Sequence, residues 1–370
     1  MDIWDLVVIG AGPAGSSAAR VAANLGLRVL LIDKARFPRD KRCAGGVSRK
    51  ALAAIPEPLP GNVIEREITS LILGGPGDFL IQESTGAPIA VTVRRSVFDS
   101  FLVDLAIGAG AEFRDNTEVL DLDEHEGFVS ISLGNVPRAA ENVRASFVIG
   151  ADGAQGKVAA LSGIRRKWRR IELGVGLYIE TTLGKAPPEA MHLYCLPELP
   201  CSFGWMFPYR DSANVGIGTW GPFSSRIPPV FHSFLERLKT KWGIRNLSQC
   251  RKRYILPAGG FTRRIAKSRI LLAGDAAGMV DPFSGEGIYY AIKSGAMAAE
   301  TVARAIRSYA HPADIAMGYQ RLCYSHFIKE FRLSAIRAFT SGYKNKIGFW
   351  FLRHDPRIAK RLIDIITGGT

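Results

Sequence analysis

The first fifteen residues contain a buried strand, a glycine-rich turn and the start of a helix. Leu6 to Ile9 form a short apolar run rich in β-branched residues, which is typical of a parallel strand buried on both faces. The glycines that follow have the spacing G-x-G-x-x-G, which allows a tight turn, a close approach of backbone to a pyrophosphate, and close packing of helix on strand. The free N–H groups of the helix then point at the phosphates. We therefore expect a dinucleotide site at Gly10, Gly12, Pro13, Ala14 and Gly15.

A second predicted strand, residues 28–32, ends in Asp33, where a carboxylate can accept hydrogen bonds from a ribose 2′-OH. A basic segment that includes Lys34 and Arg42 follows, and then the small-residue turn Cys43-Ala44-Gly45-Gly46. Such a turn can bring backbone close to a dinucleotide. Adjacent cations favour the thiolate form of Cys43. A reactive thiol and a small residue selected for fit are both open interpretations.

Two later segments repeat the pattern of a buried strand followed by glycine and a carboxylate. Residues 146–149 lead into Gly150-Ala151-Asp152-Gly153, and residues 268–273 lead into Gly274-Asp275. Pro282-Phe283-Ser284-Gly285-Glu286-Gly287-Ile288 then begins a long helix that we expect to reach Arg307. Its glycine-rich start predicts a second anion-binding helix N-terminus.

Composition limits the classes of protein that remain. The chain has 370 residues, 47% hydrophobic content and a net charge of +14, so it can bury a large core and favours anionic partners. We find no nucleic-acid module and expect no nucleic-acid partner. The five cysteines lack a C-x-x-C pair, which argues against a disulfide framework and a metal site. Without a leader sequence or a membrane-spanning run, we expect a cytoplasmic protein.

The remaining chain divides into a sheet-rich domain and a helical tail. Short alternating strands between residues 171 and 256, with a helix over Ile227–Trp242, indicate a second domain. Helices are also predicted near residues 49–55 and 93–109, and strands near residues 68–73, 79–82, 111–113, 117–120 and 129–133. The tail, about 315–366, interleaves basic and bulky apolar residues. It either packs on the core or rests peripherally on an acidic membrane surface at the inner face of the membrane.

Together these motifs resemble the FAD-binding framework of the p-hydroxybenzoate-hydroxylase-like flavoproteins, with Arg95 in an Arg-x-x-Phe-Asp segment as a further match. The resemblance implies an α/β fold: a Rossmann-like FAD-binding domain with an inserted mixed or antiparallel β-sheet substrate domain and a C-terminal helical segment. The expected boundaries are 1–70, 93–160 and 258–310 for the FAD domain, 71–92 and 171–257 for the substrate domain, and 311–370 for the helical segment. It implies FAD contacts at Gly10, Gly12, Pro13, Ala14, Gly15, Asp33, Lys34, Arg42, Cys43, Ala44, Gly45, Arg95, Val119, Asp152, Gly153, Gly274, Asp275, Pro282, Gly285, Glu286, Gly287 and Ile288.

Residues 203–218 narrow the resemblance. Phe203-Gly204-Trp205-Met206-Phe207-Pro208, followed by Gly216-Ile217-Gly218, is similar to the Y-x-W-x-F-P…G-x-G signature of the geranylgeranyl reductase family, with phenylalanine in place of tyrosine. The Cys43-Ala44-Gly45-Gly46 turn resembles the same family. Flavin-dependent halogenases carry a related W-x-W-x-I-P, and this chain lacks both the first tryptophan and the isoleucine.

The resemblance implies hydrogenation of isolated C=C bonds in a prenyl chain of a lipid or prenyl diphosphate, with hydride from N5 of reduced flavin. Aromatic faces can stabilise the tertiary cation that develops, by about 2 kcal/mol or more when desolvated. We expect Cys43 and Trp205 to be catalytic. The expected substrate pocket consists of Tyr194, Phe203, Trp205, Phe207, Pro208, Gly216, Gly218 and Phe283, although core packing is the competing interpretation for its aromatic residues.

Several alternatives remain open at this point. No second G-x-G-x-x-G follows a strand, so electrons come from transiently bound NAD(P)H or from a ferredoxin-like donor. An FAD-dependent monooxygenase acting on an aromatic or polyketide substrate shares the same frame. A flavin-containing protein that binds a prenyl lipid without turnover is a third hypothesis. The oligomeric state is not indicated.

Overall fold

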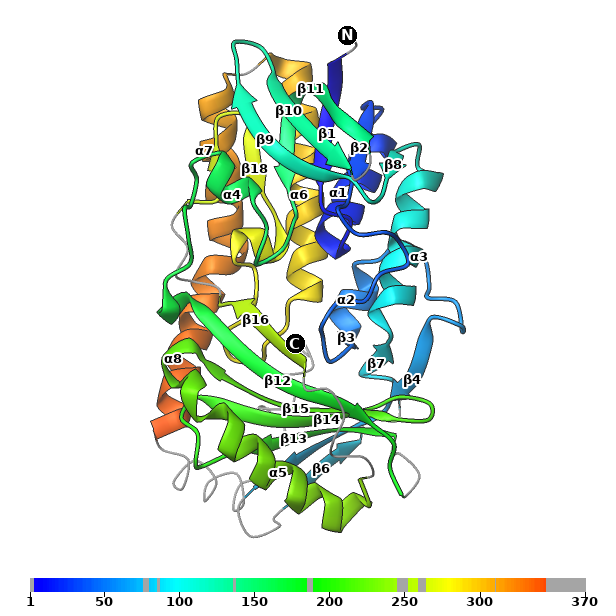
Figure 1. The fold of residues 1–370 in the computed structure, drawn as a ribbon, viewed down its shortest axis with the longest axis vertical. Coiled ribbons are helices and arrows are strands. Elements are labelled where there is room, and N and C mark those ends of the chain that lie inside the picture. The colour runs from blue at the N-terminus through cyan, green and yellow to red at the C-terminus, as the bar shows by residue number, and fades with distance from the viewer. Residues whose placement is uncertain are drawn as a thin grey trace. The chain divides into compact units, whose positions relative to one another are not determined.

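The protein consists of two compact units, each assembled from separate stretches of the chain (Figure 1). Unit 1 contains Met1–Asp40, Ser96–Arg169 and Pro257–Leu333, and unit 2 contains Lys41–Arg95, Arg170–Leu256 and the segment from Ser334. The structure is a computed structural model, which describes residues 3–75, 80–84, 87–135, 138–184, 189–244, 252–258, 264–309 and 311–343.

The central sheet of unit 1 confirms the predicted Rossmann-like arrangement. Its strand order is β17-β18-β11-β1-β2-β8, and β1 pairs in parallel with β2 and with β11. The apolar run from Leu6 to Ile9 is at most 6% exposed, as its composition predicts. The strands are β1 (Ile3–Ile9), β2 (Val29–Ile32), β8 (Glu112–Arg114), β11 (Arg138–Gly150), β17 (Ala266–Lys267) and β18 (Ile270–Leu272), with β9 (Glu118–Glu124) and β10 (Val129–Asn135) joined to β11.

Small residues allow the main helices of unit 1 to approach closely. A Cβ atom at Gly295 of α6 would lie 2.1 Å from the carbonyl oxygen of Ala14 in α1, so only glycine fits there. α6 therefore runs beside α1 (Figure 1). The helices are α1 (Pro13–Asn24), α3 (Arg95–Gly108), α4 (Val158–Leu161), α6 (Ile288–Ser308) and α7 (Pro312–Cys323), followed by the π-helical turn η5 (Tyr324–Ile328); η4 (Gly274–Ala277) is a 3₁₀ turn. The last helix, α8 (Lys329–Tyr343), begins in unit 1, and its residues from Ser334 onward belong to unit 2.

Unit 2 contains a seven-stranded sheet with the order β16-β12-β15-β14-β13-β5-β6 and a three-stranded sheet with the order β3-β7-β4. The larger sheet consists of β5 (Ser70–Gly74), β6 (Leu80–Ser84), β12 (Leu173–Thr181), β13 (Ala190–Cys195), β14 (Ser202–Pro208), β15 (Ala213–Trp220) and β16 (Lys252–Pro257). The smaller one consists of β3 (Gly46–Ser48), β4 (Ile64–Ile68) and β7 (Ala90–Val93). The helical elements are α2 (Arg49–Ala53), η2 (Arg170–Glu172), η3 (Gly221–Arg226) and α5 (Ile227–Trp242).

The two faces of the larger sheet differ in chemistry. On one face aliphatic residues such as Val215 and Ile217 pack against Phe231 and Phe234 of α5, which covers this face (Figure 1). Residues of opposite parity, Trp205 and Gly216 among them, are directly paired on the other face. There the Trp205 indole lies over Gly216, where a Cβ atom would come within 2.2 Å of the ring. The signature tryptophan thus occupies space that its glycine partner leaves free.

Most predicted elements are confirmed, and the helix predicted over Ile227–Trp242 has those bounds. The expected strand at residues 68–73 is divided instead. β4 pairs with β7 and β5 pairs with β13, so the chain passes from one sheet to another at Thr69. Because β3 also pairs with β7, residues 41–70 belong to unit 2, whereas the sequence assigned them to the FAD domain. The helical tail is described to residue 343, and the rest of the expected segment lies outside the described residues.

The packing of Trp205 on Gly216 predicts different effects for the two glycines of the G-x-G pair. Gly216→Ala should lower the free energy of unfolding by about 1–3 kcal/mol, because the added methyl group overlaps a buried ring. A Cβ atom at Gly218 would lie 3.6 Å from the same indole, so Gly218→Ala should change stability by less than about 1 kcal/mol. Urea unfolding of both variants measures the difference, and equal destabilisation would contradict this packing.

His192 lies on the face of the sheet that α5 covers, and its burial there predicts that stability depends on pH. Burial, with the charge of Lys241 as a second cause, lowers the pKa of His192 to about 4 from its ordinary 6.5. The folded state therefore excludes a proton that the unfolded chain binds, so stability should fall as the pH decreases from about 6.5 toward 4. His192→Phe should reduce this slope in urea titrations at several pH values. The matched variant His232→Phe, at an exposed position of α5, should retain it.

Candidate functional site

In the turn after β1, packing requires glycine at two of the three motif positions and leaves space beside the third. Gly10 has a φ of +100°, and a Cβ atom there would lie 2.4 Å from the Ala151 carbonyl oxygen. A Cβ atom at Gly15 would lie 1.7 Å from the Gly10 oxygen. Around a Cβ atom at Gly12, by contrast, only the guanidinium of Arg39 comes within 4 Å among the described residues, at 3.4 Å. Gly12 thus leaves backbone accessible, as a site for a pyrophosphate requires.

Both helices that begin near this turn have an N-terminus without a side-chain cap. Gly12 precedes α1 and Gly287 precedes α6, and neither provides a side-chain cap. The first turn of each helix contains no acidic residue. Their first N–H groups, which lack intrahelical partners, therefore remain available to an anion. This donor set fits the diphosphate group of FAD.

Asp33 has a structural role in addition to the one expected for it. One carboxylate oxygen accepts from the Ala11 N–H at 2.8 Å, and the other accepts from the Ala35 N–H at 2.9 Å. The carboxylate therefore links the end of β2 to the glycine turn. Each oxygen keeps a lone pair that a ribose hydroxyl could use.

Arg39 is a residue of this site that the sequence analysis missed. Its Nη2 atom lies 3.0 Å from Oδ2 of Asp99, whose side chain is 0% exposed, and its Nε atom lies 3.6 Å from Oδ2 of Asp33. The guanidinium thus connects α3 to the end of β2 beside Gly12. The signal was present in the aspartate of Arg-x-x-Phe-Asp, whose partner stands 60 positions earlier and cannot be identified without the fold.

The Asp152 segment lies at the end of β11, next to the glycine turn. Oδ2 of Asp152 accepts from the Val158 N–H at 2.9 Å, and Gly153 has a φ of +80°. Oδ1 is buried and has no hydrogen-bond partner in the described structure. Burial raises the pKa of Asp152, partly offset by its backbone hydrogen bonds. An orphaned acceptor is costly to bury, which fits a ligand hydroxyl beside it.

A tryptophan–arginine stack joins this segment to the loop after β18. The guanidinium of Arg165 lies 3.4 Å from the ring centroid of Trp168. Trp168 donates to the Ala154 carbonyl at 2.8 Å, and Arg165 donates to the Ala276 carbonyl at 2.7 Å. Arg165 and Trp168 thus fix the two loops that carry Asp152 and Asp275.

The segment from Gly274 to Ile288 forms a turn organised by Asp281. One carboxylate oxygen of Asp281 accepts from the N–H groups of Phe283 and Ser284 at 3.0 and 2.7 Å. The backbone of Asp281 also pairs with that of Glu286 and Gly285. The turn leads directly into α6, where Oδ1 of Asp275 lies 3.6 Å from the Cβ position of Gly287. A carboxylate and a helix N-terminus therefore meet at one point of unit 1.

The other expected FAD residues divide between the units. In unit 1, Lys34 is exposed after β2 and Val119 is buried in β9, while Pro282, Gly285 and Ile288 belong to the Asp281 turn or the start of α6. Unit 2 contains Arg42, Cys43, Ala44, Gly45 and Arg95. The expected pocket residue Phe283 belongs to unit 1, and the other expected pocket residues belong to unit 2.

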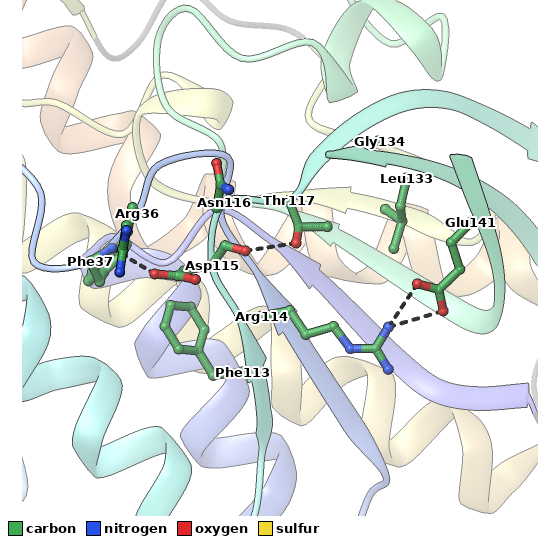
Figure 2. A pocket seen from close by; sticks show the side chains of 10 residues that line it. All are labelled: Arg36, Phe37, Phe113, Arg114, Asp115, Asn116, Thr117, Leu133, Gly134 and Glu141. Carbon is green, nitrogen blue, oxygen red and sulfur yellow. Dashed lines mark hydrogen bonds and ion pairs between the residues drawn. The ribbon is translucent and has the colours of Figure 1, made fainter. Parts of the chain in front are cut away.

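Unit 1 also has an open surface pocket of about 850 Å³ that contains none of the expected site residues (Figure 2). The Phe37 and Phe113 rings meet edge to face at 5.3 Å, and the Phe37 N–H donates to Asp115 at 2.9 Å. Thr117 donates its backbone N–H to the Asp33 carbonyl at 2.8 Å, so the pocket adjoins the end of β2. Its lining residues are Arg36, Phe37, Phe113, Arg114, Asp115, Asn116, Thr117, Leu133, Gly134 and Glu141.

In unit 2 the Cys43 turn lies against the sheet. Gly45 has a φ of +76°, and a Cβ atom there would lie 2.3 Å from the Val93 carbonyl oxygen. The Gly45 N–H donates to Sγ of Cys43 at 3.4 Å. The thiol is half-buried. Glycine at position 45 is thus required by both the backbone conformation and the adjacent strand.

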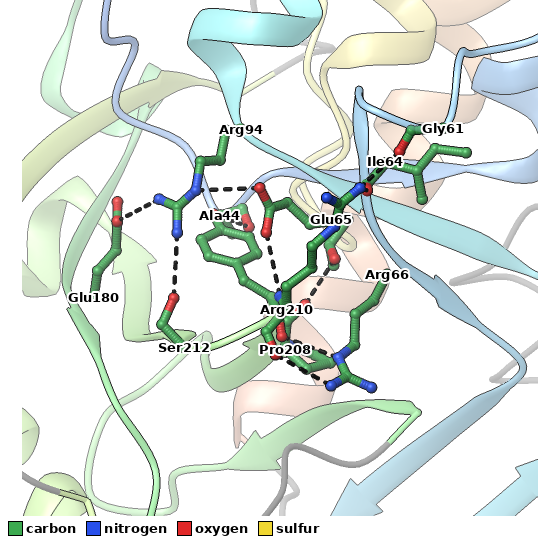
Figure 3. A network of polar contacts seen from close by, with 12 residues as sticks. Ala44, Gly61, Ile64, Glu65, Arg66, Arg94, Glu180, Pro208, Arg210 and Ser212 are labelled. Carbon is green, nitrogen blue, oxygen red and sulfur yellow. Dashed lines mark hydrogen bonds and ion pairs between the residues drawn. The ribbon is translucent and has the colours of Figure 1, made fainter.

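A polar network holds the turn after β14 in place (Figure 3). Arg94 contacts Glu65 and Glu180 at 3.2 and 3.1 Å, and Arg210 donates to the carbonyls of Gly61 and Ile64. The Pro208 carbonyl accepts from the Thr92 hydroxyl at 2.7 Å, so this residue is held as well. The network surrounds Phe207 and Pro208, the last two residues of the signature. It therefore holds the turn after them in place although the edge of the sheet is partly exposed there.

The aromatic signature residues share a face of the sheet. Trp205 is 1% exposed and contacts the rings of Phe203 and Tyr254 at 5.9 and 6.1 Å. Phe207 packs instead on a smaller core, where a Cβ atom at Gly46 would lie 2.9 Å from its ring. Tyr254, which was not anticipated, lies over Gly176 much as Trp205 lies over Gly216.

Tyr194 does not join this face. Its ring contacts Phe234 of α5 at 5.3 Å, and its hydroxyl lies 3.3 Å from Nδ1 of His192. In β13, Tyr194 is paired with Gly204, whereas Leu193 is paired with Trp205. Strand parity therefore directs Tyr194 to the α5 side.

Comparison with known proteins finds family models and relatives that match most of the chain. Residues 67–321 match the family described as FAD binding domain, and residues 5–66 match the one described as glucose inhibited division protein A. A digeranylgeranylglycerophospholipid reductase of Methanococcoides burtonii is 31% identical over 347 residues, which cover 90% of this chain and 83% of the relative. A menaquinone reductase of Mycolicibacterium smegmatis is 31% identical over 317 residues, which cover 80% and 75%.

Solved structures share the fold. A geranylgeranyl bacteriochlorophyll reductase-like protein of Thermoplasma acidophilum superposes with a TM-score of 0.84 at 26% identity, covering 91% of this chain and 87% of that one. The flavin-dependent halogenase CmlS superposes with a TM-score of 0.72 at 22% identity, covering 90% and 63%. At this identity, the likeness to the halogenase shows that the two proteins share a fold and nothing further.

The Arg39–Asp99 pair predicts a large stability effect. Arg39→Met should lower the free energy of unfolding by about 3 kcal/mol, because it removes a cation that faces a fully buried carboxylate. Adding Asp99→Asn should recover part of the loss. Arg114→Met is the matched control: its partners Glu112 and Glu141 are largely exposed, so about 1 kcal/mol or less is expected. Equal losses in urea unfolding would contradict the buried pair.

The glycine turn, the two uncapped helix N-termini and the paired Trp205–Gly216 signature occur together in a chain whose relatives match over most of its length. Within the described residues, no group of His, Cys, Asp or Glu side chains could hold a metal ion, and no helix has the length and apolar character that a membrane span requires. The chain belongs to the geranylgeranyl reductase family of FAD-dependent oxidoreductases.

Proposed function

We propose that this protein hydrogenates C=C bonds in the prenyl chain of a lipid or prenyl diphosphate. The aromatic face of the unit 2 sheet carries the proposal, because an isolated alkene offers no polar group and must be bound by apolar contacts. Curated relatives are named as reductases of a digeranylgeranyl phospholipid and of menaquinone, two substrates that share an isoprenoid chain. The chain rather than the headgroup is therefore the feature we expect this protein to recognise.

The residues of unit 1 would hold the FAD. The N–H groups at the start of α1 and α6 would bind its diphosphate, Asp33 and Asp275 would accept from its hydroxyl groups, and Gly12 would allow the backbone to approach. Reduced flavin supplies a hydride. NAD(P)H or a ferredoxin-like protein would supply the electrons that reduce the flavin.

The residues of unit 2 would handle the alkene. The partly exposed rings of Phe203 and Tyr254, with the buried Trp205 indole packed against both, would form an aromatic surface against which a tertiary cation can develop. Cys43 would deliver a proton from Sγ to the less substituted carbon. The hydrogen bond from the Gly45 N–H to Sγ occupies one lone pair of the sulfur and so restricts where the S–H bond can point.

The decisive experiment is reduction under anaerobic conditions. The purified protein is reduced with dithionite and mixed with a digeranylgeranyl phospholipid, menaquinone or geranylgeranyl diphosphate, and mass spectrometry counts 2-Da increments in the product. At least one substrate should gain them. A product 16 Da heavier in the presence of NAD(P)H and O₂ would instead show a monooxygenase. Tight lipid binding with no product under any reductant would show a binding protein.

Replacement of the thiol tests the proton donor. Cys43→Ala should slow prenyl reduction by about 10²-fold or more, because general acid catalysis contributes at least this factor. The flavin absorbance per protein should remain unchanged. Cys201→Ala, at another half-buried cysteine of unit 2, should retain the wild-type rate. Unchanged turnover in Cys43→Ala would remove Cys43 from the mechanism.

A further inference from the structure

Three successive carbonyl groups of the Cys43 turn are hydrogen-bonded within unit 2. The Cys43 carbonyl accepts from Nδ2 of Asn214 at 3.3 Å. The Ala44 carbonyl accepts from the Tyr209 hydroxyl at 3.2 Å, and the Gly45 carbonyl accepts from the Val93 N–H at 2.8 Å. The backbone of the turn is thereby held at every residue. Within the same turn the Gly45 N–H donates to Sγ of Cys43 at 3.4 Å.

Asn214 differs from the other two donors because it has two partners. Its side chain is 0% exposed, and its Oδ1 accepts from Nε1 of Trp205 at 2.8 Å. A single amide thus joins the Trp205 indole to the Cys43 carbonyl. Exchanging its oxygen and nitrogen would place two donors together and two acceptors together, so both hydrogen bonds fix one orientation.

The simplest alternative is that Asn214 only satisfies the buried indole N–H. Any acceptor would do this, and no donor to the Cys43 turn would be needed. The amide instead provides both a donor and an acceptor, and its two partners are the residues that the proposed reaction assigns to proton delivery and to the aromatic surface. Two of the three hydrogen bonds to the turn come from Tyr209, the first residue after β14, and from Asn214, the second residue of β15.

We propose that Asn214 is a positioning residue that fixes the turn carrying the Cys43 thiol relative to the Trp205 indole, because it donates to the Cys43 carbonyl and accepts from the indole N–H. This inference rests on the proposed function for the role of the thiol in turnover. The geometry of the thiol itself does not depend on which substrate the protein reduces. Its reactivity can therefore be measured without a prenyl substrate.

Two variants separate the hydrogen bonds. Asn214→Asp keeps an acceptor for Trp205 and removes the donor to Cys43, whereas Asn214→Leu removes both. Thr219→Val is the matched control, because Thr219 is buried in the same strand and donates to the Pro200 carbonyl at 2.7 Å, away from the Cys43 turn. Circular dichroism and flavin absorbance confirm that each variant is folded and loaded.

The first readout is the alkylation of Cys43 by iodoacetamide, followed on the Cys43 peptide by mass spectrometry as a function of pH. Both Asn214 variants should change the rate by about fivefold or more, the factor that corresponds to one lost hydrogen bond, and should shift the pH midpoint. Thr219→Val should stay within about twofold. Wild-type rates and midpoints in both Asn214 variants, or equal changes in Thr219→Val, would overturn the proposal.

The second readout is prenyl reduction. The rate constant kcat should fall by about tenfold while KM changes by less than about threefold, because a misplaced donor affects the reaction more than binding. If the protein reduces no prenyl substrate, the proposed function fails while the alkylation result still decides the positioning role. Normal kcat in variants with altered alkylation would exclude a role for this positioning in turnover.

Discussion

The structure of unit 1 depends on backbone approaches that only glycine allows. Gly15 lies against the Gly10 carbonyl, Gly10 lies against Ala151, and Gly295 lies against Ala14, each closer than a Cβ atom could be accommodated. These contacts bring β1, α1, α6 and the end of β11 to one point. The uncapped starts of α1 and α6 and the carboxylates of Asp33 and Asp275 follow from that convergence. The site for an anionic cofactor is therefore a consequence of packing.

Unit 2 uses glycine for a different purpose. Gly216 and Gly176 leave room on one face of the sheet, and the rings of Trp205 and Tyr254 occupy it. The rings are thereby packed against the strands, and the indole N–H donates to Asn214. The opposite face has ordinary aliphatic packing beneath α5. One sheet thus combines a conventional aliphatic core with an aromatic face.

Local patterns could be predicted, and pairings between distant segments could not. The helix Ile227–Trp242 has an apolar period, prolines near its start and Gly243 at its end with a φ of +63°, so its bounds follow from local chemistry. Arg39 and Asp99 are two polar residues with no local sign of each other. Tyr194 was expected beside Trp205, and the register of β13 on β14 directs it to the other face. Register depends on the whole sheet, which a short pattern does not contain.

The sequence by itself determined the cofactor class, the Rossmann-like element and the family, because each depends on residue types at fixed local spacing. Only the tertiary structure decided that Asp33 also shapes the glycine turn, that Arg39 faces the buried Asp99, and that Asn214 joins Cys43 to Trp205. The contact of Ala11 with Asp33 spans 22 positions along the chain, and that of Cys43 with Asn214 spans 171. A hydrogen bond or ion pair requires two groups within about 3 Å, and chain folding alone brings such distant groups together.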